Sequence, residues 1–425
     1  HMTEQRRSIH TRCCDFGSES HARHKTMSRI FYSLYDRLLH RRALAQAFAK
    51  VRRAKGAKTP GADGQTAADF ADHQEDELTR LIHELRTKTY RPQPVRRVTI
   101  PKPGGGERNL GIPAIRDRVI QQALLDILQP IFDPDFHSSS YGYRPGRSCQ
   151  QAVAKATMLI RQLHLEHAVD MDLSKCFDRL NHDVIVASFH RRVRDGSILA
   201  LLRMFLESGV MIEGNWEATE IGSPQGGVIS PLISNVYLDA FDQEMQRRGH
   251  RIVRYADDIL ILCRSRSAAE HAREIATDIL ERELRLTVNT DKTHLVHASQ
   301  GVKFLGVEID LKWIRIQDKK IDAFKAKVKA ITRRNSPVNL EKVITDLNPV
   351  LRGFANYFRM ANCTRWFREI MPWIRRRLRA KQLALWKRAS RLHRRLRQLG
   401  YRGNFLKIRM RRWRSSRSPL ASWSM

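Results

Sequence analysis

Apolar residues recur at helical spacing over several long stretches of the chain. Residues 29–54 place Ile30, Phe31, Leu34 and Leu38 on one side of a helix, and the Gly- and Pro-rich loop at 55–64 ends it. The same spacing predicts further helices at about 69–87, 115–132, 181–206 and 268–285. From about residue 320 onward all of the periodicity is helical, so the sequence predicts a helical C-terminal region.

Shorter apolar runs bounded by turn residues predict strands between these helices. Residues 91–113 read as a β-hairpin whose turn is PGGGE, and strands are expected at about 167–173, 209–221 and 301–310. The segment IVRYADDILIL, residues 252–262, reads as two short apolar strands around a tight polar turn. The pattern therefore predicts a mixed protein of class α+β, with sheets in its first three quarters.

Composition restricts the setting and the partners of the protein. The 425 residues carry 77 Lys and Arg against 44 Asp and Glu, which gives a formal charge of +33. No window approaches the ~18–20 apolar residues of a membrane span, and we expect no membrane partner. Six cysteines without a CxxC pair predict neither a disulfide framework nor a zinc site. We expect a reducing, cytoplasmic location, such as bacterial cytoplasm or nucleoid.

The positive charge is concentrated at the C-terminal end of the sequence. Between Arg375 and Arg417 there are 18 Lys and Arg, and no acidic residue follows Glu369. Apolar residues recur at helical spacing within this region, which predicts a packed helix with a basic surface for a polyanion. A solvated basic face and a helix on a membrane surface are the alternatives. Nucleic acid is the favoured partner, because cations that neutralise phosphates bind it without regard to sequence.

Two acidic motifs stand out against this basic background. Asp257 and Asp258 lie at the apex of the predicted hairpin, where two adjacent carboxylates repel each other and lose water. A turn-forming Asp pair is the structural alternative. The flanking apolar runs, together with the second acidic motif, favour a bound cation over this alternative. In VDMDLSKCFD, residues 169–178, strand alternation places Asp170 and Asp172 on one face. Spacing alone does not choose between these two carboxylates.

Together the motifs predict a site for two divalent metal ions. Two such ions ~3.5–4 Å apart stabilise both the attacking and the leaving oxygens in phosphoryl transfer. Oxygen ligands favour Mg²⁺, with Mn²⁺ as a substitute, over zinc.

The order of the motifs resembles that of reverse transcriptases encoded by bacterial group II introns. YADD at 255–258 resembles the signature of reverse transcriptases, and DLSKCF at 172–177 resembles its partner motif. Five further blocks occur along the chain in the same order as in that family: IPKPGGGERNLGIP, SYGYRPGRSCQQAV, SPQGGVISPLISNVYLD, LTVNTDKTHLV and VKFLGVEI. LRGFANYFRMA, residues 351–361, resembles its maturase-specific thumb domain. No Cys follows Cys363, so we expect no Cys/His-rich endonuclease.

This resemblance implies roles for the acidic residues and their neighbours. Asp172 and Asp257 would hold both metal ions, Asp258 would assist, and the backbone carbonyl of Leu173 would be a further ligand. Asp170 becomes the lesser candidate. Lys292 would protonate the departing pyrophosphate, with a solvated loop lysine as the alternative.

The resemblance also implies a binding site for the incoming dNTP. Lys102 and Arg108 match the pair that clamps the triphosphate, with general contact to the nucleic-acid backbone as the alternative. Phe177 matches the aromatic gate that excludes a 2′-hydroxyl, with core packing as the alternative. Gln225, with the two glycines that follow it, matches the block against the nascent base pair. Tyr141, Tyr143 and Arg144 lie where the family contacts template, and residues 51–64 resemble its template-gripping loop.

The fold that the family implies is a right-hand polymerase. Fingers and palm, an antiparallel sheet with helices, would be followed by an all-helical thumb. The expected parts are an N-terminal extension at 1–40, template loop and fingers at 41–165, palm at 166–312, thumb at 313–395, and a basic, truncated DNA-binding segment at 396–425. The reverse transcriptase domain itself would span about 80–310.

The implied function is RNA-directed DNA polymerisation. Its partners would be an RNA template, a DNA or RNA primer and dNTPs, with intron RNA as a further candidate, and the sequence does not set an oligomeric state. One alternative is a free-standing enzyme that extends short-homology ends in host DNA repair, or acts in defence. The other is a maturase that mainly binds intron RNA without catalysis.

Overall fold

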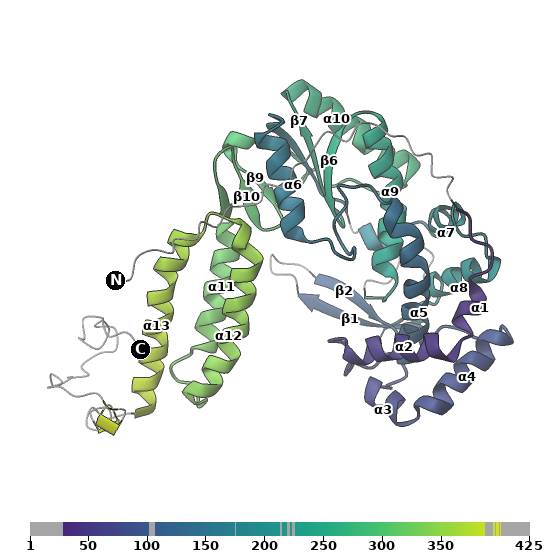
Figure 1. Ribbon diagram of the computed structural model, residues 1–425, viewed down its shortest axis with the longest axis horizontal. Coiled ribbons are helices and arrows are strands. Elements are labelled where there is room, and N and C mark those ends of the chain that lie inside the picture. Colours follow the sequence, from purple (N-terminus) through teal and green to yellow (C-terminus); the bar gives the residue numbers. More distant parts are fainter. Residues whose placement is uncertain are drawn as a thin grey trace, which may run out of the picture.

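The computed structural model describes residues 29–101, 107–174, 176–212, 215–218, 222 and 226–386, together with five isolated positions between 394 and 400. Figure 1 shows three regions in the arrangement of a right hand, with the palm at the top, the thumb helices on the left and the fingers at the lower right. None of the described helices is both long enough and apolar enough to cross a membrane.

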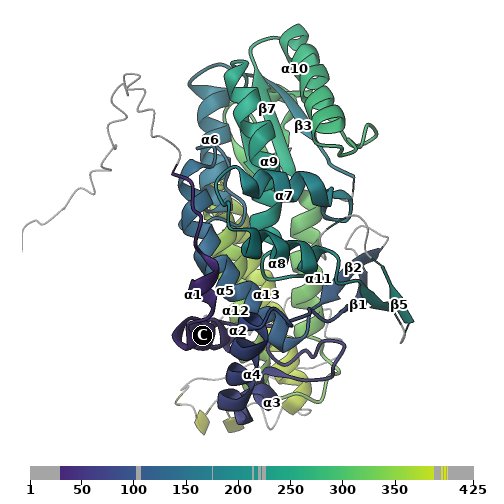
Figure 2. The same cartoon turned by 90° about the vertical axis from the view of Figure 1, so that its right-hand side faces the viewer.

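The fingers combine helices with a small sheet. The helices are α1 (Tyr35–Leu38), α2 (Arg41–Arg53), α3 (Ala67–Asp72), α4 (Gln74–Arg86) and α5 (Ile115–Phe132). The strands are β1 (Val95–Pro101), β2 (Glu107–Ile112), β4 (Val210–Ile212) and β5 (Asn215–Glu217), in the order β2-β1-β4-β5. The predicted hairpin is confirmed as β1–β2, and its turn, residues 102–106, lies outside the described residues. In the second view this sheet projects from one side of the molecule (Figure 2).

Two of the predicted helices in this region are interrupted. The helix expected at 29–54 becomes α1 and α2, because Phe31 pairs with Val193 and the amides of Leu34 and Tyr35 donate to the Asp195 carboxylate. These contacts with a distant part of the chain hold residues 31–35 away from one continuous helix. The helix expected at 69–87 is likewise two, α3 and α4, which meet at His73.

The palm is built on an antiparallel sheet with the strand order β6-β7-β3-β8. Its strands are β3 (His167–Met171), β6 (Arg251–Tyr255), β7 (Asp258–Cys263) and β8 (His294–His297). Its helices are α6 (Cys149–Arg161), α7 (His182–His190), α8 (Gly196–Leu206), α9 (Ser230–Arg247) and α10 (Arg266–Asp278). The helix expected at 181–206 is divided into α7 and α8, since Asp195 caps α8 through the amides of Ser197 and Ile198.

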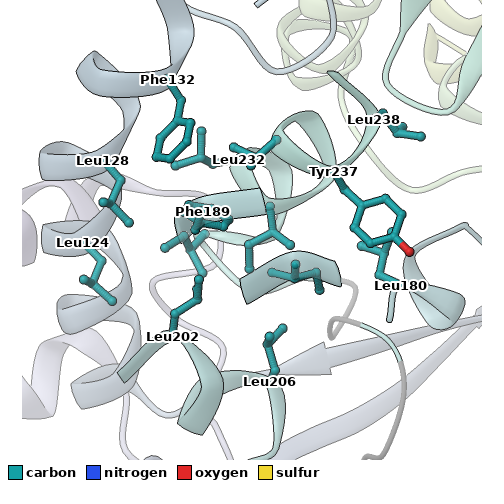
Figure 3. Close-up of a cluster of buried hydrophobic side chains, with 14 of the residues drawn as sticks. Leu124, Leu128, Phe132, Leu180, Phe189, Leu202, Leu206, Leu232, Tyr237 and Leu238 are labelled. Atoms are coloured by element: carbon teal, nitrogen blue, oxygen red, sulfur yellow. The ribbon is translucent and has the colours of Figure 1, made fainter. Parts of the chain in front are cut away.

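One large apolar core joins the fingers to the palm. In the part shown in Figure 3, leucine and aromatic side chains of α5, α7, α8 and α9 converge. Phe132 and Phe189, for example, meet edge to face with ring centroids 4.9 Å apart. This packing fixes the helices behind the palm sheet and so gives the carboxylate motifs a rigid base.

A second small sheet connects the palm to the thumb. The strand expected at 301–310 is in fact a hairpin of β9 (Val302–Phe304) and β10 (Val307–Ile309), which β11 (Ile314–Ile316) extends. Leu305 and Gly306 form its turn with φ values of 47° and 82°. Two positive φ values are typical of a two-residue hairpin turn, and Gly306 was the signal for it in the sequence.

The thumb is helical, as predicted, over the residues that the structure describes. Its helices are α11 (Asp318–Ile331), α12 (Leu340–Tyr357) and α13 (Thr364–Trp386). Phe324, Phe354 and Trp366 stack within its small apolar core. Figure 1 shows the three helices side by side, on the other side of the molecule from the fingers helices α2 to α4.

Candidate active site

The palm sheet brings the two acidic motifs together. β3 and β7 pair in antiparallel register up to Met171 and Ile259. Asp172 therefore follows the last paired residue of β3, and Asp258 precedes the matching residue of β7. Tyr255 pairs with Asp258 across the β6–β7 hairpin, which leaves Ala256 and Asp257 as its turn. The two acidic motifs therefore lie side by side, as predicted, and their joint binding of metal ions stays a prediction.

Burial and neighbouring charges raise the pKa of two carboxylates at this edge of the sheet, Asp258 and Asp170. Loss of water around Asp258, followed by the charges of Asp257, Asp170 and Asp172, raises the pKa of Asp258 to about 7. Burial raises the pKa of Asp170 to about 6, with the charge of Asp172 adding to the effect and His294 opposing it. The charge of Lys320 in the thumb likewise lowers the pKa of Asp258. The site thus holds an excess of negative charge in an otherwise basic protein.

Asp170 and Asp172 occupy different places on their shared face. Asp170 lies within the sheet, paired with Leu260 on one side and His294 on the other. Asp172 lies beyond the paired part of β3, next to the hairpin turn. The predicted alternation is confirmed, because Val169 and Met171 point into the core. The assignment of Asp172 rather than Asp170 as a ligand remains a prediction.

Two side chains of the 286–293 segment contact Asp172. Asn289 donates from Nδ2 to Asp172 Oδ2 at 3.2 Å, and its backbone amide donates to the Asp172 carbonyl at 2.9 Å. Lys292 Nζ lies 3.6 Å from the same Oδ2. Leu173 is buried and forms a bridge with Val288, which holds the two segments together. The sequence pointed to Lys292 but missed Asn289, three residues earlier in the same block.

A divalent metal ion fits the chemistry of these side chains. Carboxylate oxygens are the donors that Mg²⁺ and Mn²⁺ prefer, and a cation relieves the repulsion that raises the pKa of Asp258. Within the described part of the chain, however, no three His, Cys, Asp or Glu side chains are close enough together to hold one ion.

Comparison with known proteins identifies the family. Residues 100–309 match the reverse transcriptase (RNA-dependent DNA polymerase) family, and residues 321–400 match the maturase-specific domain of group II introns. Protein YkfC of Escherichia coli K12 is 35% identical over 300 residues, which cover 62% of this chain and 79% of YkfC. The chain belongs to the group II intron-type reverse transcriptases. The resemblance seen in the sequence motifs is thereby confirmed.

Another curated protein and a solved structure are also similar to this chain. The group II intron-encoded protein LtrA of Lactococcus lactis is 27% identical to this reverse transcriptase, over 80% of this chain and 72% of LtrA. Among solved structures, telomerase from Candida albicans overlaps with a TM-score of 0.45 and 13% identity, over 77% of this chain and 65% of that chain.

The structure places only part of the dNTP site predicted for this reverse transcriptase. Lys102 and Gln225 lie outside the described residues. Arg108 is exposed on β2, opposite Ile100. Burial raises the pKa of Tyr143, the charges of Asp257 and Asp258 raise it further, and the charge of Arg108 opposes this rise. Phe177 is half-buried in the short helix η2 (Cys176–Arg179), five residues after Asp172. The roles of Arg108 and Phe177 in dNTP binding remain predictions.

The glycine that follows Gln225 does make a close backbone approach. Gly226 has φ 121°, and a Cβ atom there would lie 2.7 Å from the Gly111 carbonyl oxygen of β2. Only glycine fits this contact between the QGG block and the fingers hairpin.

Of the three residues expected to contact template, only one is exposed. Arg144 is buried and donates to the Asp133 carboxylate and to the carbonyls of His137 and Ser140. It therefore holds its own loop, and the expectation of a template contact by its side chain is wrong. Tyr141 is buried as well, whereas Tyr143 is 51% exposed, with φ 58°.

The basic thumb surface is confirmed for the described part of α13, with two exceptions. Exposed arginines lie along this helix, at positions 365, 368, 375 and 376. Lys381, in contrast, is buried and donates to the carbonyl and hydroxyl of Ser336. Arg377 donates to Thr332 Oγ1 and lies over the Trp373 ring. These two cations hold the thumb helices together and leave the exposed arginines for nucleic acid.

Proposed function

We propose that this reverse transcriptase extends a primer on an RNA template with dNTPs and Mg²⁺. The observation that carries the proposal is the register of β3 and β7, which sets Asp172 beside the Asp257–Asp258 turn in a domain of the reverse transcriptase family. We assign Asp172 and Asp257 as the metal-holding residues, with Asp258 and the Leu173 carbonyl in support. Bound Mg²⁺ ions supply Lewis-acid stabilisation of the attacking and leaving oxygens.

The other side chains of the site bind, orient and protonate. Arg108 on the fingers hairpin, together with Lys102, binds the anionic triphosphate, since Arg108 lies in the electrostatic surroundings of Tyr143 and Asp257. Phe177 lies under the sugar and excludes a 2′-hydroxyl. Lys292 is 69% exposed, and among the described residues its ammonium contacts Asp172 alone, so it is able to turn toward the departing pyrophosphate and give up a proton.

The direct test is primer extension on a primed RNA with dNTPs and Mg²⁺. Asp172→Ala and Asp257→Ala should each lower kcat by about 10³-fold or more, because removal of a metal ligand costs several kcal/mol of transition-state stabilisation. Asp278→Ala is the matched control, since this exposed carboxylate of α10 pairs only with Arg282. Full activity in both site variants would overturn the assignment.

The sugar gate needs its own measurement. Phe177→Ala should admit rNTPs while dNTP incorporation continues, because the ring no longer fills the space of the 2′-hydroxyl. Equal discrimination against rNTPs in the wild type and in the variant would mean that Phe177 is a packing residue.

The match to the maturase-specific domain supports intron RNA as a second partner. The exposed arginines of α13 provide a surface that binds phosphates without reading sequence. Replacing Arg375 and Arg376 by Ser should weaken RNA binding and reduce its salt dependence by about two ion equivalents. Asp257→Ala should leave RNA binding intact, and a loss of RNA binding in that variant would contradict the separation of the two surfaces.

A further inference from the structure

Arg254 is a fully buried cation directly before the YADD turn. Its side chain and that of its partner Asp242 on α9 are both 0% exposed. A buried ion pair seldom adds net stability over apolar packing, because removing two charges from water costs as much as their attraction returns. The presence of Arg254 at a core position of β6 therefore calls for another explanation.

The guanidinium uses all five of its N–H groups. Nε and Nη2 donate to the Asp242 carboxylate at 2.8 and 2.6 Å. Nη1 donates to Asn235 Oδ1 at 3.1 Å and to the Ala256 carbonyl at 3.0 Å. Nη2 also donates to Ser140 Oγ at 2.9 Å. Only the planar fork of arginine presents five donors in this arrangement.

These bonds converge on the turn that carries Asp257. The Ala256 carbonyl belongs to the peptide group that it shares with Asp257, so Nη1 contacts the backbone directly before this carboxylate. Ala256 itself has φ 58°, a conformation that costs an L-residue free energy and persists only where the surroundings impose it. The network under the turn supplies such surroundings.

A neighbouring loop closes on the same turn from outside the hairpin. Gly142 packs so closely that a Cβ atom would lie 2.3 Å from the Ala256 amide nitrogen. Asn235, which Arg254 orients, donates to the Gly142 carbonyl at 2.8 Å. Backbone bonds also link Tyr141 and Ser139 to Arg254. Arg254 thus ties α9, the 139–142 loop and the turn into one unit.

We propose that Arg254 is a positioning residue that fixes the Ala256–Asp257 turn and thereby the Asp257 carboxylate for metal binding. This inference rests on the proposed role of Asp257. It goes beyond the motif residues, since Arg254 touches neither substrate nor metal and acts only through the peptide that it holds. Residues that orient metal ligands affect metal affinity or activity by about 10- to 100-fold when they are replaced.

The test uses Arg254→Lys, with Arg251→Lys on the exposed side of β6 as its control. Lysine keeps the charge opposite Asp242 but lacks the fork that reaches Ala256. We expect a folded protein with a lowered melting temperature, because buried acceptors lose their donor. We also expect Mn²⁺ affinity in electron paramagnetic resonance titrations to fall about 10-fold and kcat to fall to a similar extent. KM for primer–template should not change, and Arg251→Lys should match the wild type. A folded Arg254→Lys protein with wild-type Mn²⁺ affinity and kcat would overturn the proposal.

A second variant covers the case in which the lysine protein does not fold. Arg254→Met combined with Asp242→Leu removes both charges, a change that buried pairs often tolerate. The same losses of Mn²⁺ affinity and kcat are expected, and wild-type values in this folded double variant would overturn the proposal. Asp257→Ala separates the two claims. If it is inactive while Arg254→Lys behaves as wild type, only the positioning role fails, whereas an active Asp257→Ala protein removes the proposed role of Asp257 itself.

Discussion

The two halves of the candidate metal site are supported in different ways. The Asp257 turn rests on Arg254 and Asp242, which are both fully buried, whereas Asp172 is 41% exposed and contacts Asn289 and the 69% exposed Lys292. A buried hydrogen-bonded pair holds one geometry, and exposed pairs exchange readily with water and ions. We infer that the Asp257 carboxylate is fixed, whereas the Asp172 carboxylate adjusts when a metal ion and substrate bind.

The largest expected effect is a loss of stability when Asp242, the acidic partner of the buried Arg254, is removed. Asp242→Ala leaves the Arg254 charge buried without a counter-ion, which should lower the free energy of unfolding by about 3–5 kcal/mol. Denaturant unfolding measures this loss. The control is Glu244→Ala, two residues further along α9, whose surface pairs with Arg247 and Arg248 should contribute nothing measurable. Equal stability of the two variants would mean that the buried pair is not needed for folding.

Lys292→Met tests the exposed half of the site by removing the cation beside Asp172. It keeps the length of the side chain and removes the ammonium beside Asp172. We expect kcat to fall about 100-fold, as for loss of a general acid, with no loss of Mn²⁺ affinity, since a competing cation has gone. Primer-extension kinetics and Mn²⁺ titration give both values, with Lys303→Met, an exposed β9 lysine, as the control. Weaker metal binding together with an unchanged kcat would refute the proton-donor role.

Asn289→Ala should have a smaller effect than Lys292→Met. It removes the amide donor to Asp172 Oδ2 but keeps the backbone bond to the Asp172 carbonyl. We expect Mn²⁺ affinity to fall about 10-fold, with little change in melting temperature, because this side chain orients a ligand at a partly exposed site. A large loss of stability would show that Asn289 is a structural residue like Asp242.

The smallest effect concerns pH. The pKa of Asp258 is about 7 in the folded protein against an ordinary value of 3.8, so the folded state binds more protons than the unfolded state between these values. Stability of the metal-free protein should therefore fall as pH rises from about 4 to 7. Asp258→Asn should flatten this dependence only slightly, because the residue lies at the edge of the sheet, where solvent screens part of the interaction between the carboxylates. Melting temperatures between pH 5 and 8 measure the slope, with Asp278→Asn as the control. A steeper slope in Asp258→Asn would contradict the direction of the shift.

The sequence predicted the parts of the structure that local pattern determines. The β6–β7 hairpin, helix α5 and the alternation of Val169 and Met171 with Asp170 all follow from periods of two or 3.6 residues. Where a distant partner decides, prediction failed. Asp195 caps α8 and binds the amides of Leu34 and Tyr35, and it thereby interrupts two predicted helices at once.

The site shows the same division. The carboxylates are visible in the sequence because two adjacent charges in an apolar hairpin need a reason. Arg254 is not, since an arginine on a strand is usually solvated, and only the fold shows that it lies between α9 and the turn. The reverse holds for Arg144. A sequence motif predicted a template contact, and the burial of this side chain against Asp133 excludes that contact.

In our proposal, Asp172 and Asp257 together hold the divalent ions of this reverse transcriptase. Mn²⁺ titration, followed by electron paramagnetic resonance, of the complex with a primed RNA and an incoming dNTP tests it directly, with Asp172→Asn, Asp257→Asn and the control Asp278→Asn. We expect tightly bound Mn²⁺ in the wild type and the control, and its loss in both site variants. Undiminished Mn²⁺ binding in either site variant would contradict the claim.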